Sequence, residues 1–427
     1  MKKIFQVAIF AFAVALTACT EKKNIVNLND YEGYLQVTDS VALNNCNKEF
    51  LFWATKNTTS QSLTYQSKIA GTYAHRFAIT GKIEDVFVSD SIHQKILKAD
   101  TNRTGSYQAL AVNCMTRHEF LHAKKYTQRA LAVGDNKASS LFILFDINME
   151  LGDYGGAKYI LSKFENKNAF AYLVRAAKVD DHEGHLDVAI KKMEQALERI
   201  KDDLSLYCWT RSNLGDMYGH AGRVEDAYHA YLDVLKKNPA HDFALKGIAW
   251  IALSHDHNTA LAKQIALALQ TKKEMPDMHL LLAKIAEEEN DIVEQKKQLQ
   301  LFAQQASLAK YGNMYNKYMA LLEAEEFGNP ARTLEIAKVE IQNRPTPQSY
   351  DLLAWGYFQN GEVNKAVEVA QQHIEGKTFE PEALYHLGVI YKNRDNKKSK
   401  ILLTQALHST FELGPAVTTN IERYLKN

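Results

Sequence analysis

One pentapeptide in the chain carries residue types that could do metal chemistry. His118 and His122 are four residues apart, and Glu119 lies between them in the stretch HEFLH. On a continuous helix this spacing puts both imidazoles on one face, where they can bind zinc while the carboxylate acts as a general base. The chemistry therefore depends on whether one helix runs through residues 118–122.

Other histidines recur in polar segments farther along the chain. With the pair at 118–122 they form a set of seven: His118, His122, His182, His185, His220, His255 and His257. Carboxylates accompany them at Asp180, Asp181, Glu183 and Asp256. If these segments are turns stacked along one edge, imidazoles and carboxylates there could bind a transition metal or respond to pH. Solvent-facing turn residues explain the same pattern, so we expect no metal and no cofactor.

No other catalytic signature is present. The sequence contains no Gly-rich phosphate loop, no nucleophile elbow and no Ser-His-Asp signature. The four cysteines, Cys19, Cys46, Cys114 and Cys208, are far apart and form no CxxC pair. We expect Cys114 to be a buried thiol in a helix. The sequence therefore predicts a protein that is not an enzyme, with a zinc hydrolase built on HEFLH as an alternative.

Composition favours a helical protein without a nucleic-acid partner. Hydrophobic residues make up 46% of the chain and charged residues 24%, with only 7 prolines and 20 glycines in 427 residues. The formal net charge is +1, with 51 basic and 50 acidic residues. A balanced charge offers no electrostatic footprint for nucleic acid.

Apolar residues recur at i, i+3, i+4 and i+7 through most of the chain, which is typical of amphipathic helices. The clearest unit runs from Cys208 to His241. Small residues at Gly215 and Ala227 allow two helices to approach closely, Gly222 lies in the turn between them, and Pro239 ends the unit. Tyr218 and Tyr231 supply the large side chains that fill the space beside the small ones.

This unit resembles a tetratricopeptide (TPR) repeat. Counting from Cys208, five residues match the family pattern: Gly215, Tyr218, Gly222, Ala227 and Pro239. Arg211 replaces the Trp of the family pattern. The position of Ala227 recurs at a period near 34 residues, at Ala123, Ala157, Ala189, Ala227, Leu261, Gln295, Thr333, Ala366 and Lys400. The resemblance implies an all-α fold, a TPR-like α-solenoid of about nine helix-turn-helix repeats. In that register His118 and Glu119 lie in a turn, which argues against the zinc site.

The pattern divides the chain into five parts. We expect a signal peptide at 1–18, a tether at 19–45, a helical N-terminal cap at 46–102, a TPR array at 103–412 and a C-terminal capping helix at 413–427. The tether is polar with weak periodicity, and a flexible chain of its length would span roughly 25–30 Å. Terminal units of a repeat array are atypical because their outer faces meet solvent.

The N-terminus reads as an export signal. Two lysines precede an apolar run that is too short to span a bilayer, and the run ends in Leu16-Thr17-Ala18-Cys19. This end resembles the bacterial lipobox, which implies cleavage before Cys19 and lipidation of Cys19. Thr20 follows in place of the Asp that favours inner-membrane retention, so we expect an outer-membrane location in the cell envelope.

The TPR resemblance also implies a partner-binding concave face formed by the first helix of each repeat. Carrying the family register over predicts eight contact residues: Trp209, Phe243, Trp250, Tyr315, Tyr318, Trp355, Phe358 and Tyr385. Aromatic side chains dominate the energetics of peptide and protein interfaces. We therefore expect a membrane-anchored scaffold or adaptor for protein or peptide partners. A nutrient- or glycan-binding lipoprotein is the alternative.

Overall fold

The computed structural model describes residues 24–200, 202–273 and 275–426, and every regular element in these ranges is a helix. The N-terminal elements are α1 (Leu28–Tyr31), η1 (Glu32–Tyr34), α2 (Ser40–Ser60), α3 (Leu63–Thr80) and α4 (Glu84–Ala99). Next come α5 (Thr104–Thr116), α6 (Phe120–Val133), α7 (Lys137–Glu150), α8 (Tyr154–Ser162), α9 (Phe170–His182), α10 (Leu186–Glu198), α11 (Leu204–His220), α12 (Val224–Lys237), α13 (Asp242–Ser254) and α14 (Thr259–Lys272). The chain continues with α15 (Asp277–Glu288), α16 (Ile292–Ala306), η2 (Ala309–Tyr311), α17 (Asn316–Glu325), α18 (Pro330–Asn343), α19 (Pro347–Gln359), α20 (Val363–His373), α21 (Pro381–Tyr391), α22 (Asn396–Ala406), η3 (Leu407–Ser409) and α23 (Thr410–Lys426).

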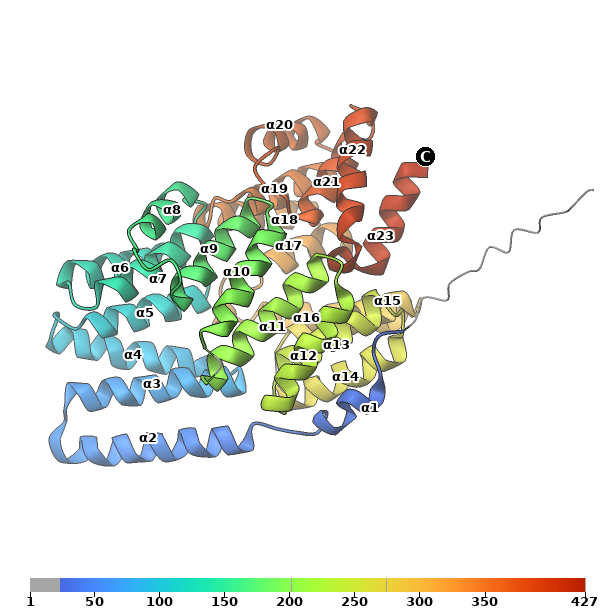
Figure 1. The fold of residues 1–427 in the computed structure, drawn as a ribbon. Coiled ribbons are helices and arrows are strands. Elements are labelled where there is room, and N and C mark those ends of the chain that lie inside the picture. Colours follow the sequence, from blue (N-terminus) through green and yellow to red (C-terminus); the bar gives the residue numbers. More distant parts are fainter. Residues whose placement is uncertain (1–23, 201, 274, 427) are drawn as a thin grey trace, which may run out of the picture.

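Helices α5 to α22 form nine successive helical hairpins, which confirms the predicted all-α solenoid (Figure 1). The fourth residue after each second-helix N-cap is the small slot of the repeat: Ala123, Ala157, Ala189, Ala227, Ala262, Gln295, Thr333, Ala366 and Ser399. The predicted slots at Leu261 and Lys400 were therefore wrong by one residue. The observed step from Ala227 to Ala262 is 35 residues and that from Ala366 to Ser399 is 33, so the predicted steps of 34 led to the neighbours of these two fully buried residues.

In eight of the nine hairpins the turn has a left-handed backbone conformation just before the N-cap. Glycine holds this position in five hairpins, at Gly152, Gly184, Gly222, Gly328 and Gly361. In the remaining three of these eight it is occupied by His118, His257 and Asn290, with φ of 56°, 52° and 56°. Asn and His tolerate this region better than most side chains do. The recurrence of histidine in these turns thus has a conformational explanation at two positions.

Replacing His257 by glycine should stabilise the protein. A left-handed conformation costs a non-glycine residue roughly 1–2 kcal/mol, and the added flexibility of glycine in the unfolded chain offsets part of that gain. We expect His257→Gly to raise the free energy of unfolding by about 0.5–1 kcal/mol in urea titrations. The exposed contact between His257 and Glu288 adds little to the wild type. His257→Ala is the control and should give no gain, because alanine keeps the strain. A lower stability for His257→Gly would contradict this explanation.

The first helices of the hairpins form the inner side of the array. Successive first helices contact each other directly, as in α5 with α7, α11 with α13, α17 with α19 and α19 with α21, whereas second helices make no comparable contacts along the described chain. Helices on the inside of a curve lie closer together than those on the outside. We call the side formed by α7, α9, α11, α13, α15, α17, α19 and α21 the inner face.

The array also coils back on itself, so distant repeats touch. Asn343 donates a hydrogen bond to the backbone oxygen of His118 at 2.6 Å. Gly152 lies against the backbone of Pro345, and Gly184 lies under the ring of Phe379. Turns of the early hairpins therefore pack on loops that precede or follow the late ones.

The segment expected to be a free tether is largely ordered and packed, which corrects the boundary at 45. Val26, Tyr31 and Leu35 are buried against the hairpins α11–α12 and α13–α14. The next helix, α2, begins at Ser40. The weak periodicity concealed three apolar residues, and these suffice to bind a short segment to a preformed surface. We call residues 24–35 the N-terminal strap. Residues 1–23, with the predicted signal peptide and Cys19, lie outside the described part of the chain.

The C-terminal helix does more than cap the last repeat. Helix α23 begins at Thr410, three residues earlier than predicted, and its backbone breaks helical geometry at Gly414, which precedes Pro415. It contacts α21 and α22, as expected for a cap, but also α11, α13 and α15 on the opposite wall. The C-terminal segment therefore covers part of the inner face.

Candidate functional site

The HEFLH pentapeptide does not form a zinc site in this fold. Helix α5 ends at Thr116 and α6 begins at Phe120, so a turn interrupts the stretch. His118 occupies the left-handed position of that turn, and its ring packs against Phe120 at 5.4 Å between centroids. His122 is in the first turn of α6 with its side chain 64% exposed. The two imidazoles therefore do not lie one turn apart on a shared helix, as the repeat register predicted.

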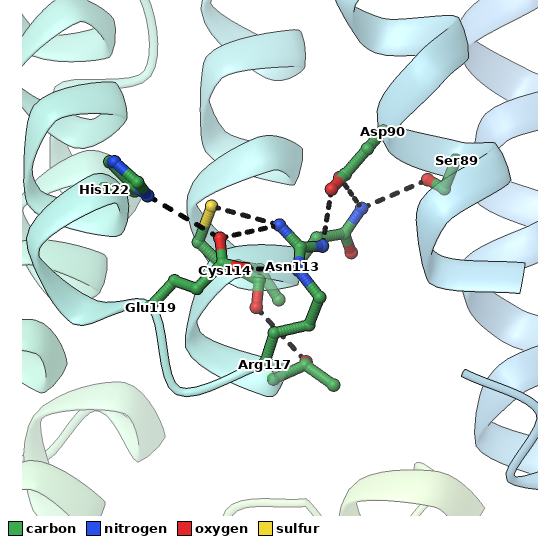
Figure 2. A network of polar contacts seen from close by, with 9 residues as sticks. Ser89, Asp90, Asn113, Cys114, Arg117, Glu119 and His122 are labelled. Carbon is green, nitrogen blue, oxygen red and sulfur yellow. Dashed lines mark hydrogen bonds and ion pairs between the residues drawn. The ribbon is translucent and has the colours of Figure 1, made fainter. Parts of the chain in front are cut away.

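Glu119, the base of the hypothetical zinc site, is held by an arginine instead. Both of its carboxylate oxygens accept hydrogen bonds from Arg117 at 3.0 Å. Burial alone would raise the pKa of Glu119, but Arg117 outweighs it and lowers that pKa. Arg117 also reaches Asp90 of α4 at 2.5 Å, and Asn113 donates to the same carboxylate at 2.7 Å (Figure 2). This network ties the turn of the first repeat to the N-terminal cap.

Four of the other five turn histidines, all but His185, lie beside an aromatic ring or a carboxylate. His182 stacks on Tyr154 with 3.7 Å between ring centroids, and His255 lies 2.7 Å from Asp256. His220 lies 3.8 Å from Glu412. Across the described residues, no group of three or more His, Cys, Asp or Glu side chains could hold a metal ion. Cys114 is buried, as expected, and its environment raises the pKa of its thiol to about 12, chiefly through burial.

Three of the eight predicted contact residues remain accessible. Trp209, Phe243 and Tyr318 are 45%, 46% and 44% exposed. Trp209 and Phe243 lie on the neighbouring first helices α11 and α13, and Phe170 at the start of α9 packs edge-on against Trp209 at 6.5 Å. Aromatic side chains thus line the beginnings of three successive first helices. We call Phe170, Trp209 and Phe243 the aromatic row.

The other five predicted contact residues are less accessible: Tyr315 and Trp355 are buried, so the prediction of a free surface was wrong for them, and Trp250, Phe358 and Tyr385 are half-buried. Tyr315 and Trp355 are 5% and 4% exposed. Trp250 donates its indole N–H to the backbone oxygen of Phe411 at 2.8 Å, so the chain's own C-terminal segment covers it. Phe358 and Tyr385 pack around Trp355. Helices α17, α19 and α21 pack so closely that aromatic residues there fill the space between helices.

The sequence analysis missed a buried charged cluster in the same region. His386 of α21 lies 2.7 Å from Asp351 of α19 and 3.8 Å from Glu325 of α17. Trp355 stacks on the His386 ring and donates to Glu325 at 2.8 Å. Burial alone would lower the pKa of His386, but Asp351 and then Glu325 outweigh it and raise that pKa to about 10. Asp351 and His386 are 35 residues apart, close to one repeat, and this spacing could have indicated that they meet on adjacent first helices.

A second pair lies beside this cluster. Lys317 of α17 and Glu382 of α21 are 2.7 Å apart and each remains about 40% exposed (40% and 39%). Burial would raise the pKa of Glu382, but Lys317 and His386 lower it.

Several carboxylates at the ends of inner-face helices form no ion pair among the described residues. Asp181, Glu287, Glu326 and Glu380 are exposed, and none forms an ion pair or side-chain hydrogen bond within the ranges that the structure describes. Burial raises the pKa of Asp181, Glu287 and Glu326, and neighbouring carboxylates add to the rise, while His220, Lys284 and Lys296 oppose it only in part. This part of the inner face is therefore suited to cationic groups.

A cavity of about 700 Å³ lies between the N-terminal cap and the hairpin α13–α14. Its lining includes Lys82, Lys272, Lys273, Lys310, Asp39, Glu84, Asp85 and Asp242. Most of these charges neutralise each other, as in Lys273 with Asp242 at 3.0 Å and Lys310 with Glu84 at 2.9 Å. The cavity therefore shows no preference for a charged ligand.

The fold defines the class of the protein, which is an all-α solenoid of TPR-like hairpins. Comparisons with known proteins identify no narrower family. No protein-family model and no curated protein matches the chain. A human IFIT1 dimer with PPP-AAAA aligns over 73% of this chain and 72% of its own, at 16% identity and a TM-score of 0.46. The TPR protein YrrB, with an unusual peptide-binding site, aligns over 45% of this chain and 95% of its own, at 16% identity and a TM-score of 0.27. A tetratricopeptide repeat protein from Parabacteroides merdae aligns over 67% and 96%, at 16% identity and a TM-score of 0.32. Similarities this distant say nothing about the ligand.

None of the helices in the described ranges has both the length and the apolar character needed to cross a bilayer.

Proposed function

We propose that this protein is a lipid-anchored scaffold of the bacterial envelope that binds a segment of a partner protein along its inner face. The observation that carries the proposal is the aromatic row. Trp209 and Phe243 keep almost half of their surface exposed, on adjacent helices that bury most of their other apolar side chains in the core. Exposed aromatic residues in a row are typical of surfaces that bind peptide segments, because each ring can bury a large area at little entropic cost.

Charge supports a partner segment with lysine or arginine. The accessible carboxylates Asp181, Glu287 and Glu326 form no ion pair within the described residues, and burial raises the pKa of each. A cationic side chain placed beside these carboxylates would stabilise their charged forms and so offset the effect of burial. Complementary charge also favours correct partners and speeds their association.

The anchor is the second part of the proposal. It rests on the two lysines, the apolar run and the lipobox-like residues Leu16 to Cys19. A lipid-modified cysteine that carries more than one acyl chain would hold a protein stably on a membrane, since each buried CH₂ contributes about 0.8 kcal/mol.

The binding surface can be tested with substitutions that leave the core intact. We expect Trp209→Ala with Phe243→Ala to weaken partner binding by a factor of roughly 30 or more, because two interface aromatics contribute about 1–2 kcal/mol each. The measurement is quantitative co-purification from detergent-solubilised envelopes, followed by titration of the recovered partner.

Tyr159→Ala is the matched control, because Tyr159 is an exposed aromatic residue of α8 and lies outside the aromatic row. It should bind the partner as the wild type does. Equal recovery of the same partners by the double variant and the wild type would refute the aromatic row as the binding surface.

A further inference from the structure

The N-terminal strap holds the start of the described chain at one edge of the array. The carboxylate of Asp256, in the turn between α13 and α14, accepts the backbone N–H groups of Ile25 and Val26 at 2.8–3.1 Å. Tyr228 of α12 accepts the N–H of Asn27 and donates to Asp30 at 3.0 Å. The Asp256 side chain is only 1% exposed. The strap is therefore fixed by charge-assisted hydrogen bonds as well as by its buried apolar residues.

This attachment limits how far Cys19 can lie from the array. Five peptide units separate Cys19 from Asn24. Even fully extended, they span no more than about 18 Å. A lipid on Cys19 would thus bring the turn that carries Asp256 close to the bilayer, in place of the long stand-off that a free tether would give.

The turn between α15 and α16, on the same edge of the array, is followed by solvent-exposed aliphatic side chains. His257, next to Asp256, lies 3.0 Å from Glu288, which places the turn between α15 and α16 beside it. Ile292 and Val293 begin α16 just after that turn and are 61% and 80% exposed. Adjacent Ile and Val side chains that face water lower the solubility of a protein. At a membrane, the same side chains can enter the headgroup region.

We propose that the edge formed by the α13–α14 and α15–α16 turns faces the bilayer, with Ile292 and Val293 in contact with lipid. The proposal rests on lipidation of Cys19, and two independent features point to the same edge: the fixed end of the strap and the exposed aliphatic pair. The beginnings of the first helices, with Trp209 and Phe243, lie at the opposite ends of those helices from these turns. In this orientation the aromatic row faces away from the membrane.

The orientation can be measured with a fluorescent reporter in reconstituted vesicles. Full-length protein with Val293→Cys is labelled with an environment-sensitive dye and placed in phosphatidylethanolamine–phosphatidylglycerol vesicles whose headgroups carry a nitroxide quencher. Tyr159→Cys is the matched control, because Tyr159 is 63% exposed and α8 lies far from α15 and α16 (Figure 1). The described native cysteines, Cys46, Cys114 and Cys208, are buried, and protein without an introduced cysteine gives their background.

We expect quenching of the Val293→Cys label to exceed that of the Tyr159→Cys label by about a factor of two or more, as contact with the headgroup layer requires. Releasing the strap with Asp256→Ala should reduce this difference while the protein stays on the vesicles. Equal quenching at the two positions in lipidated, vesicle-bound protein would overturn the orientation alone. Absence of acyl mass at Cys19, or vesicle binding unchanged by Cys19→Ala, would instead refute the lipid anchor of the proposed function.

Discussion

Asp351→Ala should destabilise the protein by about 3–5 kcal/mol, because it leaves the imidazolium of His386 buried without its carboxylate. Asp351 and His386 are 3% and 2% exposed, so water cannot replace the lost partner. The remaining carboxylate of Glu325 lies farther away, at 3.8 Å. Chemical unfolding followed by circular dichroism measures the loss.

Changing both partners separates the role of charge from that of packing. The double variant Asp351→Asn with His386→Gln has a neutral pair of similar size, so it should lose less stability than Asp351→Ala does. One oxygen of Asp351 is buried without a hydrogen-bond partner among the described residues, so the wild-type pair is already imperfectly satisfied. A single-variant loss below about 1 kcal/mol would show that the pair contributes little.

The same cluster predicts a dependence of stability on pH. The pKa of His386 is raised to about 10 in the folded protein, whereas an unfolded histidine titrates near 6.5. The stabilisation of the folded protein by charged His386 is therefore fully present below pH 6.5. It is lost as the pH rises toward 10, because the unfolded chain binds fewer protons than the folded protein over that range. Between pH 7 and 9.5 the free energy of unfolding should fall by up to about 1.4 kcal/mol per pH unit relative to the double variant. The neighbouring pair Lys317 and Glu382 stays charged in this window, because the pKa of Lys317 is raised and that of Glu382 is lowered. Parallel pH profiles for the two proteins would contradict a charged His386.

Tyr231→Ala should also cost about 3–5 kcal/mol, because it empties the centre of the largest core cluster. Tyr231 is 1% exposed and lies between two glycines of successive first helices. A Cβ at Gly215 would come within 2.6 Å of its ring, and one at Gly247 would overlap it. The phenol is therefore enclosed from two sides, and the surrounding helices cannot easily collapse into the space that it leaves.

Tyr231→Phe is the matched control. It keeps the ring and removes only the hydroxyl, which donates a hydrogen bond to Asp216 at 2.5 Å. Losing one hydrogen bond to a charged group costs about 1.5–3 kcal/mol, which is less than the loss of the whole ring. Equal losses for Tyr231→Phe and Tyr231→Ala would assign the effect to the hydrogen bond rather than to packing.

The repeat could be predicted because the geometry of each hairpin depends on residues within that hairpin. A small residue on the second helix, a left-handed turn and an amphipathic period are local requirements, and they hold at Ala157 with Gly152 as they do at Ala227 with Gly222. Even the misplaced slots at Leu261 and Lys400 were one residue from the true ones.

The binding surface could be predicted only in part, because exposure depends on contacts between distant repeats. Trp209 and Trp250 occupy first helices with the same family register, yet Trp209 is exposed whereas the backbone of Phe411, 161 residues away, caps the indole of Trp250. No local pattern contains that information. The strap was missed for the same reason, since Asp256 and Ile25 are 231 residues apart.

The contacts between early turns and late loops change how the molecule should come apart. In a linear array each repeat depends only on its neighbours, and unfolding can begin by fraying at either end. Here α23 lies against α11, α13 and α15, and Asn343 is bonded to the turn at His118. The two ends are thus tied to the middle, and the array should melt in one cooperative step, more like a globular domain than like a chain of independent units.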